Sequence, residues 1–209
     1  MQLERFVLNA YSTNCYVLYD GGEAVIVDPG GEAPKILEFL EQEKLQVVLI
    51  VNTHGHCDHI IANAWFMEKT QAPLAIHSED APFLTDPRLN LGEKVRMEVH
   101  PVKADRLLVE GEKIAFGSAS LQVIHTPGHT PGGICLYGDC VLISGDTLFR
   151  SSVGRWDFPG SDELALKSSL RRLTQLPPET KIYPGHGFST TLERELAHNP
   201  FLKSLQGSD

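Results

Sequence analysis

The sequence predicts an α/β fold in which two β-sheets pack face to face and helices cover their outer faces. Short β-like runs alternate with helical stretches, and strands followed by a helix occur in both halves of the chain. Residues 47–51 form a continuous apolar run rich in β-branched side chains, which is typical of a strand covered on both faces. No linker rich in Gly, Ser or Pro separates the halves, so we expect one domain over residues 1–209.

The first half contains three β-like runs and then two helical patterns that alternate with further strands. Turn residues Asp20-Gly21-Gly22 separate the second run from the third. Ile36, Leu37 and Leu40 recur at helical spacing. The predicted elements are strands 6–8, 15–19, 24–27, 47–51 and 74–77, and helices 33–44 and 58–70.

Residues 85–105 break this rhythm, because they combine Pro87, Gly92 and Pro101 with mixed charges. We expect a long rim loop or a small insertion, which forms one wall of a cleft. A second series of strands follows it, and Ser161 is placed to cap the next helix. The predicted elements are strands 106–109, 113–116, 119–125, 133–137, 140–144 and 181–183, and helices 162–175 and 191–198.

Composition excludes several classes of protein. Hydrophobic residues make up 42% and charged residues 22% of the 209 residues, which is ordinary globular usage and excludes disordered, coiled-coil and collagen-like chains. The net charge of −9 excludes a large nucleic-acid footprint.

No run is long and apolar enough to cross a membrane, so we expect neither nucleic acid nor membrane as a partner. The N-terminus lacks an export signal pattern and the four Cys form no C-x-x-C pair, which favours a cytoplasmic protein with reduced thiols. Oligomeric state is not indicated.

The strongest functional signal is the pattern H-x-H-x-D-H directly after strand 47–51. It contains His54, His56, Asp58 and His59. A turn from a strand into a helix can direct the first two side chains to one point and the last two to a neighbouring point. Neutral imidazole and carboxylate are ligands suited to zinc, iron or manganese.

Three further segments place a metal-capable residue beside Gly at the end of a β-like run. They end in His129, Asp146 and His186. Together with the first motif they offer five His and two Asp, enough for two metal ions with one shared carboxylate. A single structural zinc needs only four ligands and usually recruits Cys. The pattern therefore predicts a catalytic pair of divalent metal ions.

Three other residues near these motifs are candidates for supporting or substrate-binding roles rather than for metal binding. Asp28 follows a strand close to the expected site and can orient a metal ligand. Cys57 stands between ligands, where it most simply fills space. Arg155 is a candidate contact for an anionic substrate, with a structural ion pair to Asp157 as the alternative.

The order of these motifs, from the H-x-H-x-D-H string to His129, Asp146 and His186, resembles the metallo-β-lactamase superfamily. The resemblance runs from about Tyr16 to His198. It implies an αββα four-layer sandwich with a two-metal site at one edge of the sheets. By position, the first metal ion would be held by His54, His56 and His129. The second would be held by Asp58, His59 and His186, and Asp146 would bridge both.

The segment from Gly145 to Gly160 narrows the resemblance to the glyoxalase II group, especially its short single-domain bacterial members, the hydroxyacylglutathione hydrolase-like proteins. Two departures from two-domain glyoxalase II stand out. We expect no C-terminal helical domain of the kind that supplies part of the glutathione site in that enzyme, and Arg155 stands where that enzyme has Lys. Because Asp146 is present and no export signal is visible, hydrolysis of β-lactam antibiotics is not expected.

The resemblance leads to a binuclear-metal hydrolase of thioesters such as S-D-lactoylglutathione. In this hypothesis two divalent ions (zinc, or else iron or manganese) hold a bridging water and lower its pKa, so that a hydroxide attacks the thioester carbonyl. Asp58 binds one metal ion and orients that hydroxide. The alternative is a mononuclear-iron persulfide dioxygenase acting on glutathione persulfide, because the string Gly154-Arg155-x-Asp157-Phe158 also resembles that group.

Overall fold

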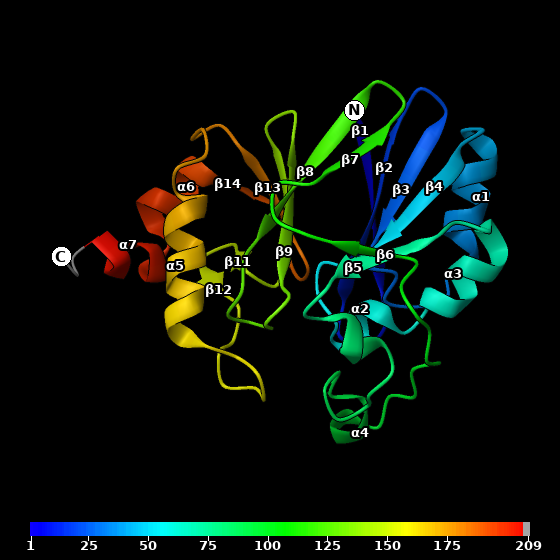
Figure 1. Cartoon of the computed structure of the whole chain (residues 1–209). Helices are drawn as coiled ribbons and strands as arrows, with labels where there is room; N and C mark the ends of the chain where they lie inside the picture. The colour runs from blue at the N-terminus through cyan, green and yellow to red at the C-terminus, as the bar shows by residue number, and fades with distance from the viewer. Residues whose placement is uncertain (207–209) are drawn as a thin grey trace.

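The computed structural model describes residues 1–206, in which two six-stranded sheets face each other between outer layers of helices (Figure 1). The first sheet keeps chain order and contains β1 (Gln2–Leu8), β2 (Thr13–Asp20), β3 (Glu23–Val27), β4 (Gln46–Val51), β5 (Leu74–His77) and β6 (Arg106–Leu108). Strands β3 to β6 are parallel, whereas β1 and β2 join antiparallel.

The second sheet has the order β14-β13-β10-β9-β8-β7. Its strands are β7 (Lys113–Phe116), β8 (Ala119–His125), β9 (Ile134–Gly138), β10 (Val141–Gly145), β13 (Lys181–Pro184) and β14 (Thr190–Thr191). A small ribbon of β11 (Leu148–Phe149) and β12 (Ser152–Val153) follows β10. The pair β10 and β13 is parallel, and the other pairs are antiparallel.

Helices cover both outer faces, and short helices lie at one end of the sheets (Figure 1). The helices are α1 (Pro34–Gln42), α2 (Cys57–Ile60), α3 (Asn63–Thr70), α4 (Gly92–Val95), α5 (Glu163–Leu173), α6 (Leu192–His198) and α7 (Pro200–Gln206), with a 3₁₀ turn at Ala81–Leu84. None of these helices, over the part of the chain that the structure describes, is long and apolar enough to span a membrane.

Three apolar layers hold the sandwich together. The first packs α1 and α3 on the first sheet and includes Ile36 and Phe66. The second lies between the sheets, where Tyr16 and Phe116 are almost completely buried. The third packs the C-terminal helices on the second sheet and includes Leu170. Successive side chains of β2 and β3 point into the first and second layers in turn, which explains why these strands are apolar throughout.

The predicted fold class is confirmed, and two local predictions are wrong. The expected helix 58–70 is interrupted between α2 and α3, because the Ala62 amide donates to the Pro29 carbonyl (3.1 Å). Asp162, not Ser161, caps α5: its Oδ1 accepts from the Ala165 amide (3.0 Å). The Ser161 hydroxyl instead donates to the His129 carbonyl oxygen (2.8 Å) and so supports a loop of the site.

The strand directions decide where the site forms. Strands β4, β8, β10 and β13 end at the same side of the sandwich, and each is followed by one of the loops that carry the predicted ligands. Loops beyond the carboxyl ends of strands are where α/β proteins usually bind ligands.

Candidate metal centre

All seven predicted ligands lie together at this edge of the sheets. Four come from the turn after β4 and the start of α2, and the loops after β8, β10 and β13 supply one each. They form three groups whose ligand atoms lie within 4.8 Å of one another: His54, His56 and His129; His54, His59 and Asp146; and Asp58, His59 and His186. The middle group shares a member with each of the others, so the cluster is compatible with two adjacent cations.

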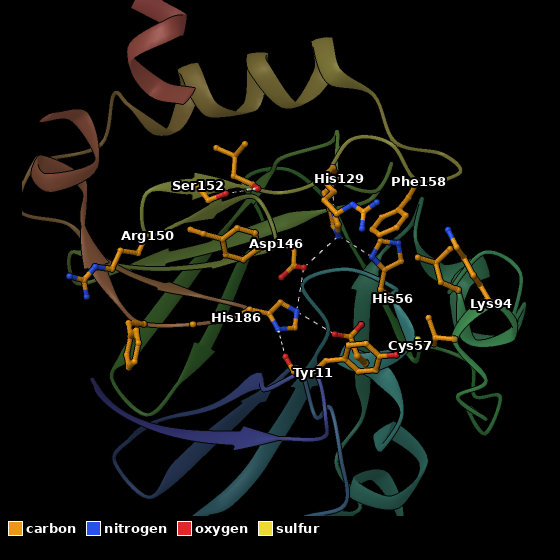
Figure 2. Close-up of a pocket in the computed structure, with 18 residues that line it drawn as sticks. Tyr11, His56, Cys57, Lys94, His129, Asp146, Arg150, Ser152, Phe158 and His186 are labelled. Carbon is orange, nitrogen blue, oxygen red and sulfur yellow. Dashed lines mark hydrogen bonds and ion pairs between the residues drawn. The ribbon is translucent and has the colours of Figure 1, made fainter. Parts of the chain in front are cut away.

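The imidazoles are oriented by hydrogen bonds on the side away from the cluster. Three of them use Nδ1 for an oxygen acceptor and turn Nε2 inward, as is common for metal-binding His. These contacts join His59 to Asp28 Oδ2 (3.0 Å), His129 to the Arg155 carbonyl oxygen (2.8 Å) and His186 to the Tyr11 carbonyl oxygen (3.1 Å). Figure 2 shows the side chains of His56, His129, Asp146 and His186 converging, with His56 turning its Nδ1 toward His129 Nε2 (2.9 Å). The Nε2 atoms of His59 and His186 are 3.2 Å apart, a spacing that suits two ligands of one ion.

The chemistry of these donors fits divalent cations. Among the described residues, His54 Nε2, His56 Nε2 and Asp146 Oδ1 are buried without a hydrogen-bond partner. Burial and the neighbouring imidazoles hold the pKa of His54 well below its usual value, so it is neutral and free to coordinate. Burial opposes charge on His59 too, yet Asp58, Asp146 and Asp28 outweigh it and raise the pKa of His59 to about 10. The cluster thus combines a neutral imidazole at His54 with carboxylates whose negative charge favours cations nearby.

Gly185 leaves the space that the cluster needs. A Cβ atom at this position would collide with Asp146 Oδ1 and lie 2.7 Å from His59 Cε1. Its amide donates to the Gly145 carbonyl oxygen (2.8 Å), which ties the loop after β13 to the loop after β10. Glycine is therefore required here by close approach rather than by an unusual backbone angle.

Asp28 performs the orienting role expected from the sequence. It is 1% exposed, and besides His59 it accepts hydrogen bonds from the amide and hydroxyl of Thr53, both at 2.7 Å. One carboxylate therefore fixes both the start of the H-x-H-x-D-H turn and the ring of a ligand within it.

Asp80 is a supporting residue that the sequence reasoning missed. Its carboxylate is fully buried and accepts from the amides of Gly55 (2.8 Å) and Gly132 (2.6 Å) and from the Thr130 hydroxyl (2.7 Å). Burial raises the pKa of Asp80, although these hydrogen bonds partly offset the effect. Asp80 thereby joins the loop that carries His54 and His56 to the loop that carries His129.

The cluster opens into a cleft of about 830 Å³. Leu91, Lys94 and Val95 line it, so the expected role of residues 85–105 as one wall is confirmed. Cys57 also borders the cleft, but burial raises the pKa of its thiol to about 12, which leaves it unreactive and fits a space-filling role.

Arg155 lines the cleft as well, and the structure shows the ion pair foreseen as its alternative role. Its guanidinium donates to both carboxylate oxygens of Asp157, at 2.9 and 2.8 Å. Both side chains are 63% exposed, so the pair contributes little to stability.

The fold and the cluster define a class: an αββα sandwich with a compact His/Asp centre at the strand ends, as in metal-dependent hydrolases. The sequence model of the metallo-beta-lactamase superfamily matches residues 8–186, and the chain belongs to this superfamily.

Relatives and solved structures agree with this assignment. Hydroxyacylglutathione hydrolase GloC of Haemophilus influenzae is 32% identical over 98% of this chain and 99% of its own length. The crystal structure of BLEG-1, a B3 metallo-beta-lactamase, superposes with a TM-score of 0.91 at 37% identity, over 96% of this chain and 99% of that one. TTHA1623, crystallised in a di-iron-bound form, gives a TM-score of 0.87 at 39% identity, over 95% of this chain and 100% of that one.

Proposed function

We propose that the chain is a thioester hydrolase that uses two divalent metal ions, with S-D-lactoylglutathione as a representative substrate. The observation that carries this proposal is the linked arrangement of three ligand groups beside an open cleft. Similarity to GloC, a hydroxyacylglutathione hydrolase, and to a di-iron-bound protein supports it.

Under this proposal one metal ion would be held by His54, His56 and His129. The other would be held by Asp58, His59 and His186, and Asp146 would bind both ions. Ions held there would supply Lewis acidity, which activates water and polarises a carbonyl oxygen. The identity of the metal stays open, because His and carboxylate ligands accept zinc, iron and manganese alike.

Asp58 is the candidate catalytic side chain. It borders the cleft, and its Oδ2 accepts from the Thr13 hydroxyl (3.0 Å) and lies 3.3 Å from His186 Nε2. Burial alone would raise the pKa of Asp58, but His59, His186 and the Thr13 hydroxyl outweigh it and lower the pKa. A carboxylate that stays ionised and is fixed in this way can accept a hydrogen bond from the attacking water and orient it toward the thioester carbonyl.

A thioester suits this site because its leaving group needs little help. Thiols have pKa values near 8.5, so a thiolate departs without a dedicated general acid. The remaining demand on the protein is to bind the two arms of the substrate, and the cleft offers the apolar side chains of Leu91, Val95, Phe149 and Phe158 for this purpose.

Two competing substrates follow from the comparisons and the sequence. Similarity to BLEG-1 makes the amide of a β-lactam ring one of them. The resemblance of the segment around Arg155 to persulfide dioxygenases makes glutathione persulfide the other, in a reaction that consumes oxygen and needs one iron.

The test is an anaerobic assay of protein loaded separately with zinc, iron(II) or manganese, after metal content has been measured. We expect loss of the thioester of S-D-lactoylglutathione without oxygen and at most slow turnover of a penicillin. Asp58→Asn should lower kcat at least about 100-fold, as expected for loss of an acid–base group. Asp139→Asn serves as the matched control, because the Asp139 side chain is 62% exposed and lies outside the cleft. Absent hydrolysis in folded, metal-loaded protein, or faster turnover of penicillin or of persulfide with oxygen uptake, would overturn the proposal.

A further inference from the structure

The cleft has a charge pattern that the metal centre does not explain. Among the described residues that line it, the carboxylates are Asp58 and Asp146, which both belong to the ligand cluster. The other charged side chains, Lys94, Arg150 and Arg155, are all cationic. In a chain with a net charge of −9, this concentration of positive charge around the substrate space favours an anionic ligand.

Lys94 is the cation left available for such a ligand. The guanidinium of Arg155 is occupied by Asp157, and Figure 2 shows Arg150 pointing away from the cluster. Lys94 forms no ion pair within the described part of the chain. Its Nζ lies 5.4 Å from the ring centroid of Phe158, and Arg155 Cζ lies 4.3 Å from the same centroid. An anion placed beside this ring therefore meets the ammonium group of Lys94, which interacts with Asp157 only at longer range.

Phe158 sets this cationic region next to the metal centre. Its ring contacts His56 nearly edge to face, with centroids 5.4 Å apart, and lies 6.0 Å from the ring of His129. Figure 2 shows Lys94 beyond Phe158 and His56 on the side away from Asp146. A substrate whose thioester reaches the cluster would thus place its anionic group beyond the Phe158 ring, beside Lys94.

Asn90 fixes the backbone that carries Lys94 relative to the ligands. The carbonyl oxygen of Asn90 accepts from the Cys57 amide (2.8 Å), at the first residue of the helix that carries two of the ligands. Its side chain donates to the Phe83 carbonyl oxygen (2.8 Å) and accepts from the Gly92 amide (2.9 Å). Helix α4, on which Lys94 stands, is therefore anchored to α2 and not a free loop.

We propose that Lys94 binds a carboxylate of the substrate and makes the enzyme selective for thioesters with an anionic arm. The proposal rests on the thioester hydrolase function and names the substrate class of that same site. The ammonium group donates charge-assisted hydrogen bonds to the carboxylate. The carboxylate can belong to the thiol carrier or to the acyl group, and the two sources are separable by experiment.

The test compares Lys94→Gln with the metal-loaded, unmutated chain on three thioesters. S-D-lactoylglutathione carries carboxylates on the carrier, the succinyl thioester of N-acetylcysteamine carries one on the acyl group, and the D-lactoyl thioester of N-acetylcysteamine carries none. We expect Lys94→Gln to raise KM about tenfold for a carboxylate-bearing thioester with kcat within about twofold, because the lost contact is one of binding. The neutral thioester should be unaffected, and Lys94→Arg should restore the KM. The matched control is Lys103→Gln, an exposed lysine of the same segment.

A binding measurement separates this inference from the proposed function. S-hexylglutathione is a thioether that cannot be hydrolysed, and its Kd measured by calorimetry should rise about tenfold in Lys94→Gln. Dependence on Lys94 for S-D-lactoylglutathione and S-hexylglutathione assigns the carboxylate to the carrier, and dependence for the succinyl thioester alone assigns it to the acyl group. If the chain hydrolyses no thioester but binding of S-hexylglutathione depends on Lys94, the proposed function fails, whereas the assignment of Lys94 as the carboxylate-binding residue of the cleft stands. Equal losses on charged and neutral thioesters, or no dependence with any carboxylate-bearing probe, would overturn the inference.

Discussion

Asp80→Asn is the substitution that best tests how the ligand loops are held. In the native protein Oδ2 of Asp80 accepts from Gly55 and Thr130, while Oδ1 accepts from the Gly132 amide. Asn keeps the shape but replaces one acceptor with an NH₂ group. If its carbonyl oxygen keeps the two donors on the Oδ2 side, the NH₂ group faces the Gly132 amide, and a buried donor is left unpaired.

The expected loss of stability follows from the number of buried donors that each substitution leaves unpaired. One buried, unpaired amide costs about 2 kcal/mol, so the free energy of unfolding of the metal-free protein should fall by about that amount in Asp80→Asn. Asp80→Ala leaves all three donors without their acceptor and by the same count should cost about 6 kcal/mol, which is above the usual range for a single substitution. Because Asp80 orients two ligand loops, metal affinity should also fall, by about 10- to 100-fold.

Urea unfolding of the metal-free variants and metal competition with a chelator measure the two effects. The matched control is Asp139→Asn: Asp139 is 62% exposed, and its ion pair is with the N-terminus at 3.5 Å. The control should change the free energy of unfolding by less than about 0.5 kcal/mol. If Asp80→Asn behaves like this control in both stability and metal affinity, the account of Asp80 as a brace between the loops is refuted.

Three further predictions concern the cluster, the C-terminal helices and the thiols. Gly185→Ala should lose bound metal, measured by elemental analysis, because the new methyl group enters the space beside Asp146; unchanged metal content would contradict this. Burial opposes ionisation of Glu195, but hydrogen bonds from its neighbours outweigh burial and lower the pKa of this carboxyl below 4.5. The ionised carboxylate therefore stabilises the fold above pH 4.5, and this contribution is lost as the pH falls through the lowered pKa. Glu195→Gln should therefore be about 1–2 kcal/mol less stable at pH 7 in urea unfolding, with a smaller difference in acid; a constant difference down to acid pH would contradict the reasoning. Ellman's reagent should react quickly with Cys140 alone in the native chain, because the other three cysteines, Cys57 included, are buried, and rapid reaction of a second thiol would contradict that assignment.

Much of the fold could be predicted because several of its strands have a recognisable local sequence pattern. Residues 47–51 and 24–27 are apolar on both faces, and only a strand between two packed layers needs such a sequence. The edge strand β1 begins at Gln2, earlier than predicted, although its alternation of polar and apolar residues is itself typical of a half-buried strand. The break between α2 and α3 was hidden, since it depends on Pro29, a residue distant in sequence.

The metal ligands could be located from sequence because each lies in a short motif at a strand end. Their supports could not all be found in this way. Asp28 follows a strand near the ligands and was predicted, whereas Asp80 lies 25 residues from Gly55 and 52 from Gly132, with no local motif. Lys94 likewise stands in a segment without periodicity, and only the fold shows that it faces the cleft.

We propose that two metal ions per chain support hydrolysis of a thioester. A titration of metal into metal-free protein without oxygen tests this, when bound metal and hydrolysis of S-D-lactoylglutathione are followed together. We expect activity to rise with the second equivalent, and we expect Asp146→Ala, which removes the carboxylate between the two sites, to abolish it. Full activity at one bound ion per chain, or in the Asp146→Ala variant, would contradict the claim.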